Sequence, residues 1–354
     1  MIKKVLTGIL FLLPCLTITG QEGFPVDFDP DPRGINKLRV MFYNVENLFD
    51  TENDPEKKDD EYTPEGDRRW SEYRFWEKVN NLASVIISVG GWEAPAIIGL
   101  CEVENRNTLN ALFYGTGLKK FNYEIVHVAS PDERGIDVAL AFNPKKLTKL
   151  SKKAFPVCLE PYSSRPTRDI LYVKMKTLSQ DTIHVLVNHW PSRWGGEKAS
   201  RPRRIKAASI LKSITDSLEN LPGKQNILIM GDFNDEPSDK SLYHTLQARD
   251  TTENPRLINL MLPYLGKNRG SYFYSDDTGT QWNLLDQFIV SGPMMKEEGL
   301  YTKPRAHIFD ADFLMTEDNG IKKPYRTYLG FRYIGGYSDH LPVYMDISTK
   351  YSAY

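Results

Sequence analysis

The chain has 354 residues, of which 40% are hydrophobic and 26% are charged, close to globular averages. These proportions exclude a disordered, collagen-like or low-complexity protein, and the length allows one large domain or two small ones. The net charge of −1, from 45 basic and 46 acidic residues, excludes a dedicated polybasic nucleic-acid binder. Any polyanion that this protein handles must therefore meet a local basic patch.

Residues 1–20 have the pattern of a secretory signal peptide. Two lysines precede the apolar run Val5–Leu13, which is too short to span a bilayer, and the segment ends on the small residue Gly20. We predict cleavage before Gln21 and a secreted or periplasmic location. No later stretch is apolar over about 20 residues, so we expect no stable membrane insertion.

The cysteines leave two alternatives open. Cys15 permits a lipoprotein anchor, although Pro14 stands where such a site needs a small residue. After cleavage only Cys101 and Cys158 remain, which is too few for a disulfide framework. They either form one bridge in an oxidising compartment or are two buried small hydrophobes.

Residues 21–36, rich in proline and glycine, predict an extended leader, and residues 37–350 predict one large domain. Short apolar runs there alternate with helical patterns. We predict strands at Leu38–Tyr43, Ala96–Cys101, Val138–Phe142, Ile170–Met175, Ile183–Val187, Ile227–Met230, Leu285–Val290 and Pro342–Ile347. We predict helices at Ser71–Ser88, Thr108–Tyr114, Ser200–Leu218 and Lys240–Gln247, the third with Ser200 as its N-cap and Pro202 in its first turn. This alternation indicates an α/β protein, and runs such as NILIM indicate strands buried on both faces.

The acidic segment Asp50–Glu61 is typical of a solvated loop, with a calcium site as the alternative.

Six polar clusters stand at the ends of these strands or beside them. They are Asn44 with Glu46 and Asn47, Glu102, Asn188 with His189, Asp232 with Asn234, Asp286, and Asp339 with His340. Sheets of α/β proteins place ligand sites at strand ends. Carboxylates and amides without a thiolate suit Mg²⁺, with Mn²⁺ or Ca²⁺ as alternatives. Such an ion neutralises charge and orients water, which fits phosphoester hydrolysis.

The order of seven motifs resembles the endonuclease/exonuclease/phosphatase superfamily, in particular its deoxyribonuclease-like and secreted bacterial members. The motifs are YNVENLF, LCEVEN, RGIDVAL, VNHWPSR, MGDFND, LLDQFIV and SDHLPV, between Leu38 and Ile347. The resemblance implies a four-layer α/β sandwich in which two packed mixed β-sheets are flanked by helices. It also implies that residues 37–350 form a phosphoester-hydrolysing catalytic domain.

The resemblance implies a metal site and a proton-handling site. Asn44, Glu102 and Asp339 match the metal-binding positions, and Asp339 also matches an acid that assists the leaving group. Asp232 matches the residue that polarises the attacking water, and Asn234 a phosphate contact. His340 matches the histidine at the scissile phosphate.

The remaining positions are supporting ones. Asp286 matches the carboxylate that orients this histidine, and His189 matches a catalytic histidine of the deoxyribonuclease branch. We expect Asp137 to hydrogen-bond His189 and Asn188 to contact substrate.

Three arginines complete the predicted substrate contacts. They are Arg134, Arg165 and Arg193. Arg193 starts a basic stretch that runs to Lys206 beside Trp190 and Trp194, and this basic and aromatic mixture suits a phosphate-rich polymer. The alternative for Arg201–Lys206 is a solvated helix face.

The tyrosine-rich segment Tyr325–Tyr337 either forms an aromatic wall over the site or packs against the sheet.

Three enzyme functions stay open. The chain is a secreted nuclease, a phosphatase or phosphodiesterase on small phosphates, or a lipid phosphodiesterase. A non-catalytic binding module would lack one of the site residues, and none is missing. No obligate protein partner is evident.

Overall fold

The computed structural model describes residues 25, 28–29, 37–253, 255–276 and 279–349. The predicted signal peptide and all but three residues of the predicted leader lie outside the described residues. Among the residues described, no helix combines the length and the hydropathy needed to cross a membrane.

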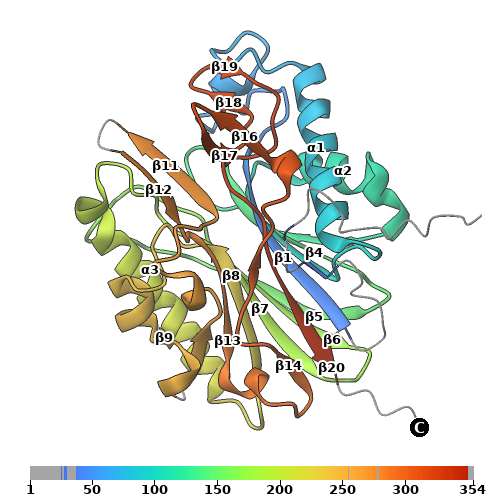
Figure 1. Ribbon diagram of the computed structural model, residues 1–354, viewed down its shortest axis with the longest axis vertical. Coiled ribbons are helices and arrows are strands. Elements are labelled where there is room, and N and C mark those ends of the chain that lie inside the picture. The colour runs from blue at the N-terminus through green and yellow to red at the C-terminus, as the bar shows by residue number, and fades with distance from the viewer. Residues whose placement is uncertain (1–24, 26–27, 30–36, 254, 277–278, 350–354) are drawn as a thin grey trace, which may run out of the picture.

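Two large mixed sheets form the centre of the fold, as predicted (Figure 1). The first has the order β14-β20-β1-β2-β4-β3, and β15 pairs with β20; its strands are β1 (Lys37–Leu48), β2 (Ile97–Val103), β3 (Glu124–His127), β4 (Asp137–Phe142), β14 (Leu300–Thr302), β15 (His307–Ile308) and β20 (Val343–Thr349). The second has the order β5-β6-β7-β8-β13-β10-β9; its strands are β5 (Leu147–Phe155), β6 (Ile170–Thr177), β7 (Thr182–His189), β8 (Asn226–Asp232), β9 (Ala248–Arg249), β10 (Leu257–Asn259) and β13 (Asp286–Ser291). We call them sheet A and sheet B.

Three α-helices cover the outer faces. They are α1 (Glu72–Gly90), α2 (Arg106–Tyr114) and α3 (Glu197–Glu219). Figure 1 shows α1 and α2 on the side of sheet A and α3 on the side of sheet B, which gives the four layers that the sequence predicts.

Short elements make up the rest. The helical turns are η1 (Asp60–Tyr62), η2 (Gly117–Phe121), the π-helical η3 (Lys240–Leu246), η4 (Thr251–Glu253), η5 (Leu262–Tyr264), η6 (Gly292–Met295) and η7 (Asp312–Leu314). Three hairpins project from the sheets: β11 (Tyr272–Asp276) with β12 (Gly279–Asn283), β16 (Met315–Asp318) with β17 (Ile321–Pro324), and β18 (Tyr328–Leu329) with β19 (Arg332–Tyr333).

Because side chains alternate along a strand, a single strand contributes residues to two hydrophobic cores. In β8, Leu228 and Met230 belong to the core between the sheets, whereas Ile227 and Ile229 belong to the core under α3. Successive side chains of a strand point to opposite faces, so such a strand is apolar on both. The two sheets approach closely at Gly99, where an added Cβ would lie 2.8 Å from Met230 Sδ.

All eight predicted strands are present, and seven are confirmed to within one or two residues at their ends, whereas β1 continues five residues beyond the predicted end at Tyr43 to Leu48. Helix α1 begins after Ser71, as predicted, and α2 is capped by Asn105, whose side chain accepts from the backbone N–H groups of Asn107 and Thr108. The predicted start of α3 is wrong, because the helix begins at Glu197 after Gly196. Ser200 therefore donates to the Gly196 carbonyl instead of capping the helix, and Pro202 lies in the helix interior.

The two cysteines in the described part of the chain are free: Cys101 is buried and Cys158 is exposed. The expectation of two buried small hydrophobes is therefore correct for Cys101 alone.

Candidate active site

The polar clusters meet at one end of the two sheets because strand alternation directs them there. In β7 and β8, His189 and Asp232 follow Val187 and Met230 at a spacing of two residues, so they continue the face that packs between the sheets. Asp286 likewise shares its face with Phe288 of β13. Neighbouring strands hold these groups in register, since His189 pairs with Asp232 and Asp232 pairs with Asp286.

Glu102 reaches the site through a backbone irregularity. The buried Cys101 thiol lies near His189 and Asp232, so regular alternation would turn Glu102 to the opposite face. The pairing of β2 with β4 shifts between Cys101 and Val103, and Glu102 has a φ of +63°. This left-handed bulge directs the carboxylate into the cleft, a type of geometry that clusters at functional sites.

A cleft of about 630 Å³ lies over these groups. The predicted site residues that line it are Glu102, Arg134, His189, Arg193, Asp232, Asn234, Asp339 and His340. Eight of the predicted site residues thus meet in one concavity, of a size usual for ligand pockets.

His340 is the most constrained group of the cleft. Its Nδ1 lies 2.6 Å from Asp286 Oδ2, and its Nε2 lies 3.9 Å from Asp232 Oδ2. Burial lowers the pKa of His340, but the neighbouring carboxylates, led by Asp286, outweigh it and raise the pKa to about 10. The imidazole is therefore protonated near neutral pH and directs its second N–H toward the cleft.

Asp232 is the buried carboxylate at the centre. Burial raises its pKa to about 6, against the opposing effect of the His340 charge. Its Oδ1 accepts from the Asn234 backbone N–H at 2.9 Å, and its Oδ2 accepts from Asn44 Nδ2 at 3.1 Å. A carboxylate with a pKa near neutrality suits general-base chemistry.

His189 differs from His340 in charge. Burial first, then Arg168, Arg134 and His340, lower its pKa well below the ordinary value, so the ring is neutral. Its Nε2 lies 3.7 Å from Asp232 Oδ2 and 3.8 Å from Glu102 Oε1, and its buried Nδ1 has no hydrogen-bond partner. The expected bond from Asp137 is wrong, because Asp137 lies 2.8 Å from His127 Nε2 and accepts from the Ser130 backbone.

Asn44 and Glu102 lie side by side at the predicted metal position. Asn44 Nδ2 donates to Glu102 Oε1 at 3.3 Å, and its Oδ1 accepts from the Glu46 backbone. Glu102 Oε2 accepts from the Asn47 backbone at 3.1 Å. The amide nitrogen of Asn44 thus faces the carboxylates, and Glu102 Oε1 is the oxygen directed at the cleft.

The donor set fits a hard divalent cation. Potential ligand atoms of Asp232, Asp286 and His340 lie within 4.8 Å of one another, as do those of Cys101, His189 and Asp232. Burial raises the pKa of the Cys101 thiol, so it is no thiolate ligand. His340 Nδ1 is already engaged by Asp286, and the carboxylates that line the cleft include Glu102, Asp232 and Asp339, whose oxygens suit Mg²⁺, Mn²⁺ or Ca²⁺.

Asp339 is held in place by a network of charged side chains that reaches from the cleft rim into the interior. Arg326 NH2 donates to Asp339 Oδ2 at 3.1 Å and its Nε donates to Glu46 Oε1 at 3.3 Å. Glu46 in turn lies 3.9 Å from the buried ammonium of Lys78. Glu46 therefore supports the site through Arg326 rather than facing the cleft.

Two predicted substrate contacts lie elsewhere. Asn188 is fully buried, donates to the Leu186 and Met230 carbonyls and accepts from Trp190 Nε1, so it packs the strand end and is not in the cleft. Gly231 is needed opposite it, since a Cβ there would lie 2.4 Å from the Asn188 carbonyl oxygen. Arg165 lines a second cavity beside the cleft.

The basic stretch after Arg193 is only partly a solvated face. Arg204 is wholly buried and its Nε donates to Asp235 Oδ1 at 2.6 Å. Arg193 lines the cleft, but Glu197 and Asp239 lie within 3.6 Å of it and offset its charge. The positive potential that the run of arginines suggests is therefore reduced by Glu197 within the stretch and by Asp235 and Asp239, which are distant in sequence.

The tyrosine-rich segment Tyr325–Tyr337 packs instead of forming a wall, since Tyr328 contacts Trp70 and Tyr337 contacts Phe313. The wall comes from the β11–β12 hairpin, which the sequence analysis missed. Its cleft-lining residues are Tyr272, Tyr274, Gln281 and Asn283. The alternation of Tyr272 and Tyr274 before a glycine turn was the available signal.

Comparisons with known proteins agree with this geometry. Residues 39–349 match the Endonuclease/Exonuclease/phosphatase family. No curated protein sequence matches the chain.

Three solved structures share the fold. The human Nocturnin catalytic domain with bound sulfate is 17% identical, with a TM-score of 0.54 over 89% of this chain and 95% of that one. A mannosyl-6-phosphatase from Bacteroides thetaiotaomicron is 14% identical, with a TM-score of 0.54 over 88% and 99%. TDP2 from D. rerio, in complex with a single-strand DNA product, is 13% identical, with a TM-score of 0.54 over 88% and 99%.

Enzymes of this family depend on divalent metals, and the cleft holds candidate metal-binding residues, among them Asp232. From the match over 39–349, the shared fold and the residues gathered in the cleft, the chain is a member of the endonuclease/exonuclease/phosphatase family and a hydrolase of phosphoester bonds.

Proposed function

We propose that the chain is a divalent-metal-dependent phosphodiesterase that cleaves nucleic acid. The observation that carries the chemistry is the 2.6 Å contact between His340 Nδ1 and Asp286 Oδ2, which leaves a charged N–H directed at the cleft beside Asp232. A fixed cation of this kind stabilises negative charge that develops on a phosphoryl oxygen.

The residues divide the reaction between them. Asp232 accepts the proton of the attacking water, for which its raised pKa is suited. His340 donates a hydrogen bond to the phosphoryl group, and Asp286 keeps its charge and orientation. The neutral His189 faces the same space and binds the opposite side of the phosphate.

The metal has a defined place in this scheme. Glu102 would hold the cation, with Asp339 at the rim of the cleft, which leaves Asp232 free to act as the base. When bound, a divalent ion neutralises charge on the phosphoryl oxygens. We propose Mg²⁺, because few carboxylates combined with substrate phosphate is its usual environment, and Mn²⁺ or Ca²⁺ are the alternatives for the test.

The rim of the cleft supports a nucleic acid. Trp194 is 72% exposed and lines the cleft together with Arg134 and Arg193. Exposed aromatic side chains stack on bases, and neighbouring arginines bind phosphates. A protein of the same fold, TDP2, was solved with a single-strand DNA product.

A phosphatase acting on a small phosphate is the second candidate. The cleft has the volume of a small-ligand pocket, and the acidic rim residues Glu197 and Asp339 would repel a long polyanion. A neighbour in fold is a mannosyl-6-phosphatase. A lipid phosphodiesterase has no feature of the described residues in its favour.

The test incubates the purified protein with plasmid DNA, single-stranded DNA, RNA, bis(p-nitrophenyl) phosphate and sugar phosphates, each with Mg²⁺, Mn²⁺, Ca²⁺ or EDTA. We expect cleavage of nucleic acid and of the diester, its loss in EDTA, and a steep decline with salt. Asp232→Asn and His340→Ala should each lose at least about a hundredfold in rate and remain folded. Release of phosphate from sugar phosphates alone would replace the proposal by the second candidate.

We also propose, from the sequence pattern of residues 1–20, that the protein is secreted or periplasmic after cleavage before Gln21. The N-terminal sequence of protein recovered outside the cytoplasm should then begin at Gln21. Recovery of the intact N-terminus, or a lipid on Cys15, would contradict cleavage at this position.

A further inference from the structure

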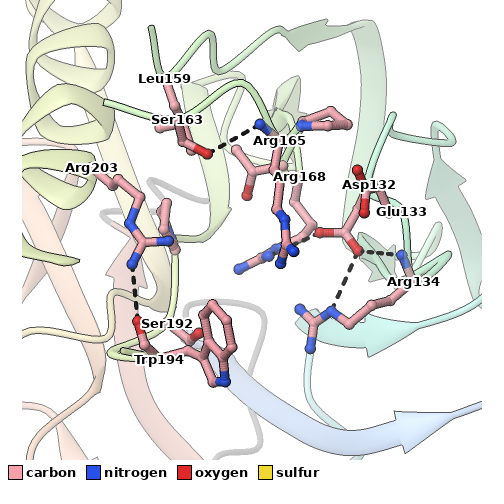
Figure 2. Close-up of a pocket in the computed structure, with 13 residues that line it drawn as sticks. Asp132, Glu133, Arg134, Leu159, Ser163, Arg165, Arg168, Ser192, Trp194 and Arg203 are labelled. Carbon is pink, nitrogen blue, oxygen red and sulfur yellow. Dashed lines mark hydrogen bonds and ion pairs between the residues drawn. The ribbon is translucent and has the colours of Figure 1, made fainter. Parts of the chain in front are cut away.

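A second cavity, of about 300 Å³, opens beside the catalytic cleft. Three loops and the start of α3 form it: the β3–β4 loop gives Arg134, the β5–β6 loop gives Arg165, the β7–α3 loop gives Trp194, and α3 gives Arg203 (Figure 2). Arg134, Ser192 and Trp194 line both cavities, so the two are adjacent. We call the second one the side pocket.

The carboxylates of the side pocket are already neutralised. Asp132 Oδ2 accepts a hydrogen bond from Arg168 NH1 at 3.0 Å. Asp132 Oδ1 lies 3.5 Å from Arg134 Nε, and Figure 2 marks this ion pair with a dashed line. Glu133 is ion-paired with Lys58, which lies outside the pocket. Lys58 is thus the ion-pair partner of Glu133, and the more distant Arg165 also acts electrostatically on the Glu133 carboxylate.

Arg165 and Arg203 have no such partner. Within the described residues neither forms an ion pair with a carboxylate: Arg165 lies over the Trp194 ring at 5.6 Å, and Arg203 donates to the Trp194 carbonyl at 3.0 Å. Trp194 thus positions one guanidinium through its ring and the other through its backbone. Two guanidinium groups that have no ion-pair partner among the described residues and are held around one opening suit an anion, since arginine forks match phosphate oxygens.

We propose that the side pocket binds a second phosphate of the substrate, next to the phosphate that is cleaved, through Arg165 and Arg203. The inference rests on the proposed phosphoester hydrolysis and extends it to substrate class. A substrate that carries two phosphates spans the shared wall at Arg134 and Trp194, with one phosphate at His340 and the other in the side pocket. In a nucleic acid the second phosphate is a flanking linkage, and in a small molecule it is the second group of a bisphosphate.

Equilibrium binding tests the pocket independently of turnover. Calorimetric titration compares thymidine 3′,5′-bisphosphate with thymidine 5′-monophosphate, and fructose 1,6-bisphosphate with fructose 1-phosphate, on the full chain. The Arg165→Ala/Arg203→Ala variant should bind the preferred bisphosphate at least about tenfold more weakly and its monophosphate less than about twofold more weakly. Tighter binding of the thymidine compounds identifies the second phosphate as that of a nucleic acid, and tighter binding of the fructose compounds identifies it as that of a small bisphosphate.

Matched variants keep the result specific. Lys206→Ala removes a cation of α3 that lines neither cavity and should leave both affinities unchanged. Equal affinity of the wild-type protein for both members of each pair, or equal weakening of both in the double variant, would overturn the proposal.

Turnover separates this outcome from failure of the proposed function. The p-nitrophenyl ester of thymidine 5′-phosphate, with and without a 3′-phosphate, should show a KM that rises in the double variant only when the 3′-phosphate is present. If neither ester is cleaved while the difference in affinity persists, the side pocket stands and the proposed chemistry fails.

Discussion

His340 Nδ1 lies 2.6 Å from Asp286 Oδ2, and this contact joins the two sheets across the end of their shared core. Asp286 opens β13 of sheet B, whereas His340 lies three residues before β20 of sheet A. Both side chains are buried, so the charge on the imidazole depends on a carboxylate from the opposite sheet. The sites of proton transfer and metal binding are likewise divided between the sheets.

Replacement of Asp286 tests this contact. Asp286→Asn keeps the volume but removes the negative charge that raises the pKa of His340, so kcat should fall by about 10²-fold or more. The measurement is the steady-state rate on bis(p-nitrophenyl) phosphate, with far-UV circular dichroism to verify folding. The surface variant Asp181→Asn should keep the wild-type rate, and an active Asp286→Asn enzyme would show that His340 works without its carboxylate.

The same contact predicts a pH dependence of stability. The pKa of folded His340 is raised to about 10, above about 6.5 in the unfolded chain, so the folded state retains a proton that the unfolded state releases. This stabilisation is complete below about pH 6.5 and is lost as the pH rises to about 10.

Comparison with His340→Gln tests it at pH values above the pKa of Asp232, whose titration also responds to the charge of the imidazole. In EDTA, the difference in free energy of unfolding should shrink by on the order of 1 kcal/mol per pH unit across that interval. Denaturant unfolding at several pH values measures it, and parallel curves for the two proteins would contradict the protonated imidazole.

Lys78 should be a large determinant of stability. Its ammonium is buried in α1, donates to Thr327 Oγ1 at 2.5 Å and to the Tyr337 carbonyl at 2.6 Å, and faces Glu46. Lys78→Met leaves the Glu46 carboxylate with less compensation, and loss of one partner of a buried pair costs about 3–5 kcal/mol.

A double-variant cycle checks the cause. Glu46→Gln in the Lys78→Met background should restore part of the lost free energy of unfolding, because no unpaired carboxylate remains. If the two losses simply add, the effect of Lys78 comes from packing or from its hydrogen bonds and not from Glu46.

Arg204 provides a similar test on sheet B. The side chain is 0% exposed and pairs with Asp235 of the MGDFND motif, so Arg204→Met leaves this buried carboxylate with only the more distant Arg193 guanidinium, 4.0 Å away, and should cost about 3–5 kcal/mol. Arg201 lies on the same helix in a partly exposed pair with Glu197, and Arg201→Met should change stability by less than about 1 kcal/mol. Thermal unfolding of the two variants makes the comparison, and similar losses would contradict a structural role for Arg204.

Much of the site was predictable because its residues follow strands that are apolar on both faces. Such runs fix where a strand ends, and the face of His189, Asp232 and Asp286 then follows from alternation. The direction of the Glu102 side chain into the cleft was not predictable in this way. It depends on a β-bulge in which Glu102 has a φ of +63°, and no turn-forming residue at this position indicates the bulge.

The ion pairs that neutralise the basic stretch were the second feature that the sequence did not reveal. The run from Arg193 to Lys206 appears as one basic patch in the sequence, yet Arg204 is neutralised by Asp235 and Arg193 by Glu197 and Asp239. Ion pairs between distant segments depend on tertiary packing, which local patterns do not encode. The same holds for Tyr272, whose ring lies 4.8 Å from the His340 ring although 68 residues of chain separate them.

The close approach of the sheets at Gly99 and Met230 limits how this enzyme can be engineered. Glu102 belongs to one sheet and Asp232 to the other, so the thickness of the layer between the sheets sets the distance between these two carboxylates of the cleft. A methyl group added at Gly99 has to displace the Met230 thioether, 2.8 Å away, or part the sheets. Attempts to raise thermal tolerance by filling that layer would alter turnover before they altered the melting point.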